Sequence, residues 1–346
     1  MPHVRTDNQE GAMKPILTGL FMTDTHVKGI NPRGRLDDYP TTILRKIEWV
    51  VNTAIERRVD VVLHGGDWFD TFEVSDKVKA SLIAVLRRLD HAGIPLLGVH
   101  GSHDVHGYAA STLPRTSLGV LRAAGVVSLL GYGDIVEVPP GVTIGGIPHI
   151  PGLDDPEHPD ASYELPRRCQ ILLAHGTLVE SPLPDGFSHT LLSDVQVNAD
   201  LVLSGDYHPG YPVYQRSDGV TFYNPGSLAR VKGTPNNRSR RPGVAYFELF
   251  TGNTAPRVDF LPVPADIARP GDEIFSEGTS AEPPPDTDIA QLVRALKEQT
   301  DTNTVRFDPL VMLENLPLDS LTDDPGLAAE AKALAAREIQ AAMERR

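Results

Sequence analysis

Five short hydrophobic runs along the chain each end abruptly in a polar, glycine-containing cluster. The runs and their clusters are "ILTGLFM" and "TDTH", "VDVVL" and "HGGDWFD", "IPLLGV" and "HGSHD", "QILLA" and "HG", and "ADLVLS" and "GDYH". Runs of this length that are rich in leucine and β-branched residues predict buried strands. The pattern therefore predicts several strands whose carboxyl ends carry polar side chains.

Between the first three runs, hydrophobic residues recur with the spacing of amphipathic helices. We expect one helix in residues 41–58 and a second in residues 75–92, where Ser75 suits the N-cap and Gly93 the C-terminal stop. Strands that alternate with helices of this length predict an α/β layered fold. The two apolar stripes are Ile43, Leu44, Ile47, Val50, Val51 and Ile55, and Val78, Leu82, Val85, Leu86 and Leu89.

The second half of the chain has a different texture. Short strands such as "GVTIGGI", "GVTFYN" and "GVAYFELF" dominate residues 142–250, which predicts a second sheet packed on the first. Residues 263–288 are rich in proline and acidic side chains and read as a linker, and two helices are expected in residues 289–346. We therefore expect a catalytic domain in residues 14–262, an acidic linker and a helical appendage that suits docking on a partner.

Composition restricts the environment of the protein. Cys169 is the only cysteine among 346 residues, so no intramolecular disulfide is possible, and no segment approaches the roughly 18 apolar residues of a membrane span. These features predict a soluble cytoplasmic protein. The net charge of −14 argues against a polyanionic partner, but residues 263–346 hold 8 basic and 17 acidic side chains and so account for most of it.

The polar clusters carry the side chains of a metal centre. Open α/β sheets build their sites at the carboxyl ends of strands, and carboxylates with imidazoles at one edge match the ligands of a two-metal centre. Each cluster alone is better explained by a polar turn or a buried core side chain, but their order and common position favour a metal site. The candidate residues are Asp24, His26, Asp67, Ser102, His103, Asp104, His175, Asp206 and His208.

In order, the motifs "DTH", "GGDWFD", "GSHD", "AHG", "GDYH" and "NPGSLAR" resemble those of the calcineurin-like metallophosphoesterases. Within that superfamily the chain is most similar to the SbcD type of DNA double-strand-break repair nuclease, over about residues 14–260. The resemblance implies two packed β-sheets flanked by helices, a four-layer sandwich, with two divalent ions. Mn²⁺ is the expected metal, with Mg²⁺ or Fe²⁺ as alternatives. It also implies DNA as substrate, an SbcC-like ATPase as partner and a homodimer.

The resemblance also implies a role for each residue. Asp24, His26 and His208 would hold the first ion, Asp67 would bridge both ions, and His175 would hold the second. His103 would contact the scissile phosphate and protonate or stabilise the leaving group.

Asp104 would orient His103. In the family pattern, asparagine usually stands at the position of Ser102 and histidine at that of Asp206. Both departures affect the second ion, so we expect that site to be occupied, weaker and rich in oxygen ligands.

The segment "RVKGTPNNRSRRP" is the densest basic run in the chain. We expect its cations to contact the phosphate backbone of DNA without reading its sequence. A solvated loop explains the run equally well. The candidate DNA-binding residues are Arg230, Lys232, Arg238, Arg240 and Arg241.

The sequence favours a Mn²⁺-dependent DNA exonuclease and endonuclease that works with metal-activated water. A second interpretation keeps the metal chemistry but has a nucleotide or a phosphoprotein as substrate. A third is a non-catalytic binding scaffold that lost its metal through Ser102 and Asp206. His103 and most of the expected metal ligands are intact, which argues against that scaffold.

Overall fold

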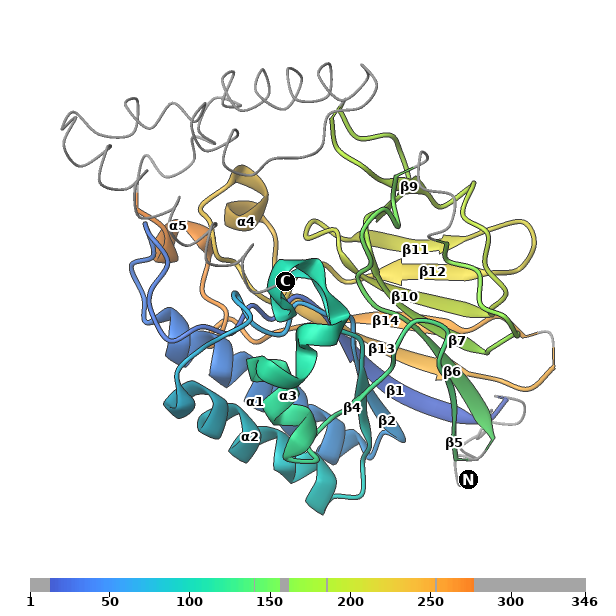
Figure 1. Ribbon diagram of the computed structural model, residues 1–346, viewed down its shortest axis with the longest axis horizontal. Helices are drawn as coiled ribbons and strands as arrows, with labels where there is room; N and C mark the ends of the chain where they lie inside the picture. Colours follow the sequence, from blue (N-terminus) through green and yellow to red (C-terminus); the bar gives the residue numbers. More distant parts are fainter. Residues whose placement is uncertain (1–12, 140, 156–161, 185, 253, 277–346) are drawn as a thin grey trace, which may run out of the picture. The chain divides into compact units, whose positions relative to one another are not determined.

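Two six-stranded β-sheets packed face to face form the centre of the molecule (Figure 1). The computed structural model describes residues 13–139, 141–155, 162–184, 186–252 and 254–276. Side chains from both sheets meet in a buried core between them, for example Phe21 and Phe247 from the first sheet and Leu173 and Leu203 from the second. The predicted architecture of two packed sheets is confirmed.

The first sheet has the strand order β14-β13-β1-β2-β3-β4. Strands β1 to β4 are parallel, and β13 and β14 continue the sheet in antiparallel fashion beyond β1. The parallel strands have hydrophobic neighbours on both faces, which explains their nearly continuous apolar sequences. The strands are β1 (Leu17–Met22), β2 (Val61–His64), β3 (Leu96–Gly98), β4 (Ser128–Leu129), β13 (Gly243–Leu249) and β14 (Arg257–Pro262).

The second sheet has the order β11-β12-β10-β7-β6-β5, with four parallel strands in the middle and an antiparallel strand at each edge. Its central strands β7 and β10 carry polar side chains near their carboxyl ends, at His175 and Asp206. The strands are β5 (Ile135–Val138), β6 (Val142–Ile147), β7 (Ile171–Gly176), β10 (Leu201–Asp206), β11 (Tyr211–Gln215) and β12 (Thr221–Asn224).

One strand lies in a different sheet from the one we expected. The sequence "GVAYFELF" predicts a member of the second sheet, but β13 pairs with β1 in the first. Its residues alternate between two cores, because Ala245 and Phe247 face the second sheet whereas Val244 faces the helices. A strand buried on both faces fits the interior of the first sheet, and this is where β13 lies.

Helices α1 (Tyr39–Arg57), α2 (Asp76–His91) and α3 (Ser117–Ala123) cover the outer face of the first sheet (Figure 1). The apolar stripes predicted for α1 and α2 pack against that sheet. Helix α1 begins after Asp38, whose carboxylate accepts a hydrogen bond from the backbone N–H of Thr41 at 3.2 Å. Both helices therefore lie within two residues of their predicted positions.

The outer face of the second sheet is covered by irregular chain. Leu153, Tyr163 and Leu192 from the segments that connect its strands pack on Leu172 and Val202 of the sheet. The short strands β8 (Leu178–Val179) and β9 (Thr190–Leu191) lie within these segments. Among the described residues this layer contains no α-helix, so the expected helices flank the first sheet alone.

The folded domain continues beyond the predicted boundary at residue 262. Val263, Ile274 and Phe275 are almost fully buried, and the backbone N–H of Leu36 donates to the carbonyl of Ile274 at 2.9 Å. The linker prediction is therefore corrected for residues 263–276, because their apolar side chains pack on the domain. The remainder of the predicted linker and the helical appendage in residues 289–346 lie outside the described residues.

The short helices α4 (Pro235–Ser239) and α5 (Gly271–Ile274) lie near the end of this folded part.

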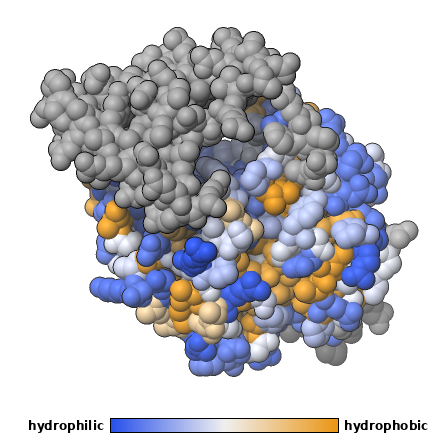
Figure 2. Space-filling view, in the orientation of Figure 1, coloured by the Kyte–Doolittle hydropathy of each residue, from blue (hydrophilic) through white to orange (hydrophobic). Residues whose placement is uncertain are grey.

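Hydrophobic and hydrophilic residues are interspersed on the face seen in Figure 2. No helix in the described part of the chain is both long enough and apolar enough to cross a membrane.

Candidate metal centre

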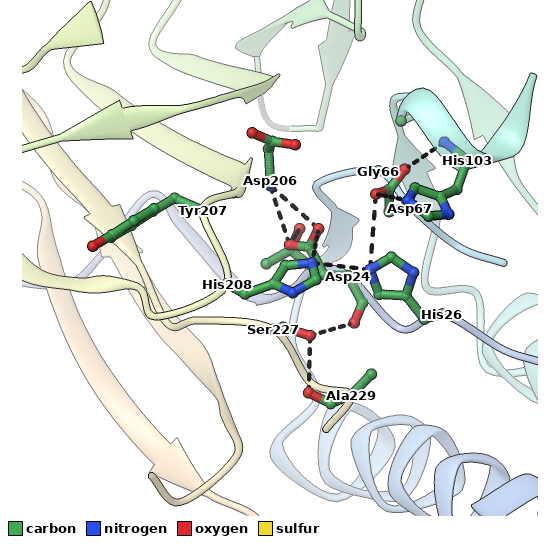
Figure 3. A network of polar contacts seen from close by, with 12 residues as sticks. Asp24, His26, Gly66, Asp67, His103, Asp206, Tyr207, His208, Ser227 and Ala229 are labelled. Atoms are coloured by element: carbon green, nitrogen blue, oxygen red, sulfur yellow. Dashed lines mark hydrogen bonds and ion pairs between the residues drawn. The ribbon is translucent and has the colours of Figure 1, made fainter. Parts of the chain in front are cut away.

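Seven predicted side chains come together where the central strands of both sheets end, and Figure 3 labels all of them except His175. They form two groups that share Asp67, and within each group the possible ligand atoms lie within 4.8 Å of one another. The first sheet supplies members of both groups, and the second sheet completes them. The first group is Asp24, His26, Asp67 and His208, and the second is Asp67, His175 and Asp206. The seventh side chain, His103, lies beside them.

Asp67 faces both groups with different oxygen atoms. Its Oδ2 lies 3.8 Å from Nε2 of His26, and its Oδ1 lies 3.6 Å from Nε2 of His175. The backbone of Gly101, on the next loop, approaches Asp67 so closely that a Cβ added there would lie 2.0 Å from Oδ1 of Asp67. This arrangement suits a carboxylate that bridges two cations.

The donor atoms fit divalent ions. Nε2 of His175 is buried and has no hydrogen-bond partner among the described residues, although carboxylate oxygens of Asp67 and Asp206 each lie 3.6 Å away. Nδ1 of the same ring lies 2.7 Å from the carbonyl oxygen of Gly65, which places a proton on Nδ1 and turns Nε2 toward the carboxylates. Buried imidazole and carboxylate atoms that converge in this way are typical of a metal site.

The backbone is strained at four of these residues. Asp24, His26, Asp67 and Asp206 have φ angles of 51°, 38°, 52° and 73°. Non-glycine residues in this left-handed region cost roughly 1–3 kcal/mol each and concentrate at functional sites. The turns after β1, β2 and β10 therefore use strain to aim side chains toward a common point.

The electrostatics of the cluster favour a positive charge at its centre. Burial by itself would raise the pKa of Asp24, but the hydrogen bond and charge of His208 and the charges of other histidines lower it below its usual range. Burial opposes protonation of His175, yet the carboxylates of Asp67, Asp206 and Asp24 raise its pKa to about 9. The negative charges of these three carboxylates thus favour a positive charge at the centre of the cluster, which is what a bound cation supplies.

His103 is held by a different residue from the one that we expected. Its Nδ1 lies 2.7 Å from the carbonyl oxygen of Asp70, and its Nε2 lies 4.0 Å from Oδ2 of Asp67. Asp104 is fully buried and accepts hydrogen bonds from the backbone N–H groups of Gly101, Trp68 and Phe69. The predicted contact between Asp104 and the His103 ring is therefore corrected: Asp104 ties the two loops together, and Asp70 orients the ring.

The two unusual residues at the second group have different surroundings. Asp206 belongs to the group, and its Oδ2 accepts a hydrogen bond from the hydroxyl of Thr177. Ser102 lies in the 3₁₀ turn Ser102–Asp104 and lines a cavity beside His103. A role for Ser102 at the second ion stays a prediction.

Several supporting residues were missed by the sequence interpretation. Ser227 donates to the carbonyl of Asp24 at 2.9 Å, and Asp70 and Thr177 hold His103 and Asp206 as described above. Asp70 and Ser227 stand inside the motifs "GGDWFD" and "NPGSLAR", so position in a motif could have indicated them. Thr177 follows "AHG" without any chemical signal of its own.

His64 lies beneath the site. Its Nε2 is 3.1 Å from the hydroxyl of Thr25, its Nδ1 accepts from the N–H of Gly66 at 3.2 Å, and its ring stacks on Trp68 with centroids 3.7 Å apart. Burial lowers its pKa to about 3. His64 therefore supports the loops after β1 and β2 as a neutral ring.

The cations of the predicted basic segment differ in their exposure and in their hydrogen-bond partners. Arg230 is 2% exposed and donates to backbone carbonyls at residues 237 and 269, whereas Arg240 donates to the carbonyls of residues 227 and 229. Arg238 donates to the carbonyls of residues 233 and 276 and lies 3.4 Å from the carboxylate of Asp272. The expectation that Arg230 contacts DNA is therefore corrected, because this side chain is buried and bound to carbonyl groups. For the half-buried Arg238 and Arg240, contact with DNA stays a prediction. Lys232 and Arg241 are exposed.

Comparison with known proteins agrees with this geometry. A model of the calcineurin-like phosphoesterase family matches residues 18–210. Over 275 residues the chain is 26% identical to the DNA double-strand break repair protein Mre11 of Methanosarcina mazei, and this match covers 74% of the chain and 42% of that protein.

Two further relatives carry the same description. The chain is 30% identical over 191 residues to Mre11 of Haloferax volcanii, which covers 55% of the chain and 41% of that protein. It is 27% identical over 253 residues to Mre11 of Saccharolobus solfataricus, which covers 72% and 62%. The chain thus spans about half the length of the relatives it matches. Because the family model matches more than half of the residues and the metal-site geometry agrees, the chain belongs to the calcineurin-like phosphoesterase family.

Proposed function

We propose that this protein is a DNA nuclease that hydrolyses phosphodiester bonds with the help of two divalent metal ions. The observation that carries the proposal is the pair of ligand groups that share Asp67, with Nε2 of His103 only 4.0 Å from Oδ2 of that carboxylate. Relatives named as DNA double-strand break repair proteins support DNA as the substrate. Sites of this kind suit phosphoryl chemistry, because they place cations where negative charge develops.

Each group of side chains would hold one ion. Asp24, His26 and His208 would hold the first and His175 and Asp206 the second, with one oxygen of Asp67 toward each. When bound, two such ions neutralise phosphate charge and lower the pKa of a water molecule. The carboxylates supply hard oxygen ligands and the imidazoles nitrogen ligands, a set that suits Mn²⁺ and also admits Mg²⁺ or Fe²⁺.

His103 would serve as the general acid. Hydrolysis joins the oxygen of water to phosphorus and breaks the bond from phosphorus to the leaving oxygen, which must take up a proton. The bond from Nδ1 to the carbonyl of Asp70 fixes the ring so that Nε2 faces the ligand groups and can deliver that proton. The His103 side chain is 47% exposed, so bulk water can restore the proton after each turnover.

The DNA itself would be held by exposed cations. Lys232 and Arg241 project from the segment that follows the "NPGSLAR" turn, and that turn contacts Asp24 through Ser227. They would bind the phosphate backbone near the metal centre without reading sequence. We also propose action as a homodimer with an SbcC-like ATPase, on both the ends and the interior of DNA strands.

The proposal is tested with protein purified in the presence and in the absence of Mn²⁺. Bound ions are counted per chain, and hydrolysis is followed on linear duplex DNA, single-stranded DNA and an aryl phosphate diester. We expect two ions and faster hydrolysis of DNA than of the aryl diester. One ion per chain at saturating Mn²⁺ with full activity, or faster hydrolysis of the aryl diester than of DNA, would contradict it.

A further inference from the structure

A cavity lined by exposed aromatic side chains lies next to His103. Its lining includes His103, Phe72, Ser102 and Tyr108. Phe72 is 36% exposed and Tyr108 is 61% exposed, whereas half of the aromatic side chains of the described domain are buried. Two exposed aromatic rings beside the proposed general acid are an unusual feature for a surface that binds no apolar group.

The backbone holds Tyr108 in an unfavourable conformation. Its φ is 58°, in the left-handed region that bulky residues rarely adopt, and the preceding Gly107 also has φ 58°. Such a conformation costs roughly 1–3 kcal/mol and needs support from its surroundings. The Tyr108 ring packs on His149, with centroids 5.6 Å apart, and His149 in turn contacts His175 at 6.3 Å. The strained turn thus carries an exposed ring to the rim of the metal centre.

Phe72 is held on the other loop that borders the cavity. Its ring meets that of His106 edge to face, with centroids 4.9 Å apart and an interplanar angle of 85°. Phe72 follows Asp70 by two residues, and the carbonyl of Asp70 orients His103. Phe72 and the His103 ring are therefore fixed by the same short segment.

A neighbouring cavity is acidic instead of aromatic, and His149 in its lining lies against the Tyr108 ring. This second cavity borders Asp206 and is lined by Asp154, Asp155, Thr177 and His149. Carboxylates repel the phosphate backbone of a nucleic acid, whereas aromatic faces attract nucleobases by stacking. The two cavities therefore differ in what part of a nucleotide each can accept.

We propose that the aromatic cavity is a nucleobase subsite in which the base of the leaving nucleoside stacks on Tyr108 and Phe72. The inference rests on the proposed nuclease function. Because His103 delivers a proton to the leaving oxygen, the nucleoside attached to that oxygen lies on the His103 side, where this cavity opens. Stacking contacts of this kind tolerate all four bases, so the subsite selects nucleic acid without selecting sequence.

The experiment uses the full-length protein with Mn²⁺ and short oligonucleotides that contain one cleavable phosphodiester. A single abasic residue is placed on one side of that bond or on the other, and the fragment that ends in a hydroxyl identifies the leaving side. We expect the abasic residue to lower kcat/KM about tenfold to a hundredfold on the leaving side, as loss of a stacked base does. On the opposite side it changes kcat/KM less than twofold.

Variants connect this loss to the two rings. Tyr108→Ala lowers the sensitivity to the abasic residue. With Phe72→Ala added the sensitivity disappears, and the intact oligonucleotide is then cleaved as slowly as the leaving-side abasic one is by the unmodified protein. Tyr108→Phe restores that sensitivity, because stacking needs the ring and not the hydroxyl. Tyr132→Ala removes another exposed tyrosine, outside the lining of this cavity, and serves as the matched control.

The outcomes separate the subsite from the function on which it rests. If the protein hydrolyses DNA but the leaving-side abasic residue has no effect, or if Tyr108→Ala stays fully sensitive to it, the subsite is refuted alone. If the protein with Mn²⁺ hydrolyses no oligonucleotide, the proposed nuclease function fails and the subsite fails with it.

Discussion

The hydroxyl of Thr177 donates a hydrogen bond to Oδ2 of Asp206, and Oδ1 of the same carboxylate lies 3.6 Å from Nε2 of His175. The backbone N–H of Thr177 donates in turn to Oδ2 of Asp154 at 2.7 Å. Asp154 is held by the hydroxyls of Tyr163 and Thr190. A chain of hydrogen bonds thus fixes the carboxylate that stands where the family usually has histidine.

We predict that Thr177→Val weakens the second metal site. Valine keeps the shape of threonine but leaves Oδ2 of Asp206 without its donor, so the carboxylate can rotate away from His175. Loss of a partner that orients a ligand typically reduces metal affinity about 10- to 100-fold. Calorimetric titration with Mn²⁺ measures the effect, and the first site should keep its affinity.

Thr221→Val is the matched control for this substitution. The Thr221 hydroxyl is buried and has no hydrogen-bond partner among the described residues, and it lies on β12. Its removal should leave both metal affinities unchanged. Equal affinities of Thr177→Val and the unmodified protein for the second ion would show that Asp206 needs no support from Thr177.

We predict that His103→Gln lowers kcat on DNA by about 10²- to 10⁴-fold, the usual contribution of a general acid. Both ions should still bind, because His103 belongs to neither group of ligand atoms. Rapid-quench kinetics measures kcat, and metal analysis of the same sample checks occupancy. Undiminished hydrolysis with both ions present would exclude His103 as the proton donor.

We predict that two kinds of cation in the basic segment affect different properties: the cations bound to carbonyl groups affect stability, and the exposed cations affect DNA affinity. Arg240→Met should destabilise the fold by roughly 1–3 kcal/mol for each carbonyl left unpaired, seen as a lower urea midpoint. The double variant of Lys232→Ala and Arg241→Ala should keep that midpoint but bind DNA more weakly. The slope of log affinity against log salt concentration should become shallower by about 0.9 for each phosphate group that the variant no longer neutralises.

The reverse pattern would contradict this division. If the two exposed positions leave both DNA affinity and its salt dependence unchanged, the DNA follows another surface of the domain. If Arg240→Met retains full stability, its bonds to the carbonyls of residues 227 and 229 contribute little to the turn that carries Ser227.

We predict an unusual pH dependence of stability from Lys46. Its ammonium group is buried and donates to the carbonyl of Leu228 at 2.8 Å. Burial, together with the charges of Arg230 and Arg240, lowers its pKa well below the ordinary value of 10.5. The unfolded chain therefore binds this proton more tightly, and the free energy of unfolding should rise with pH from the lowered value up to 10.5.

Lys46→Met removes this contribution. Urea titrations at several alkaline pH values measure the free energy of unfolding of the variant and of the unmodified protein. The difference between these two free energies should shrink on approach to pH 10.5. A difference that does not change with pH would mean that the folded protein leaves the pKa of Lys46 at its ordinary value.

The sequence by itself determined the elements and most of the chemistry. Strands β1, β2, β3, β7 and β10 and helices α1 and α2 lie close to their predicted positions, because period and burial are written in the local order of apolar residues. The polar residues that follow those strands include every member of the two ligand groups. Only residues adjacent to strand ends could be found in this way.

The tertiary structure decided which residue acts on which. Asp104 and Asp70 both stand near His103, but the approach of two loops determined that the carbonyl of Asp70 holds the ring. Arg230 and Arg240 look like surface cations in sequence, yet the fold buries Arg230 and binds the guanidinium groups of both to backbone carbonyls. Such partners lie far apart along the chain or belong to the backbone, which carries no sequence signal, so only packing could reveal them.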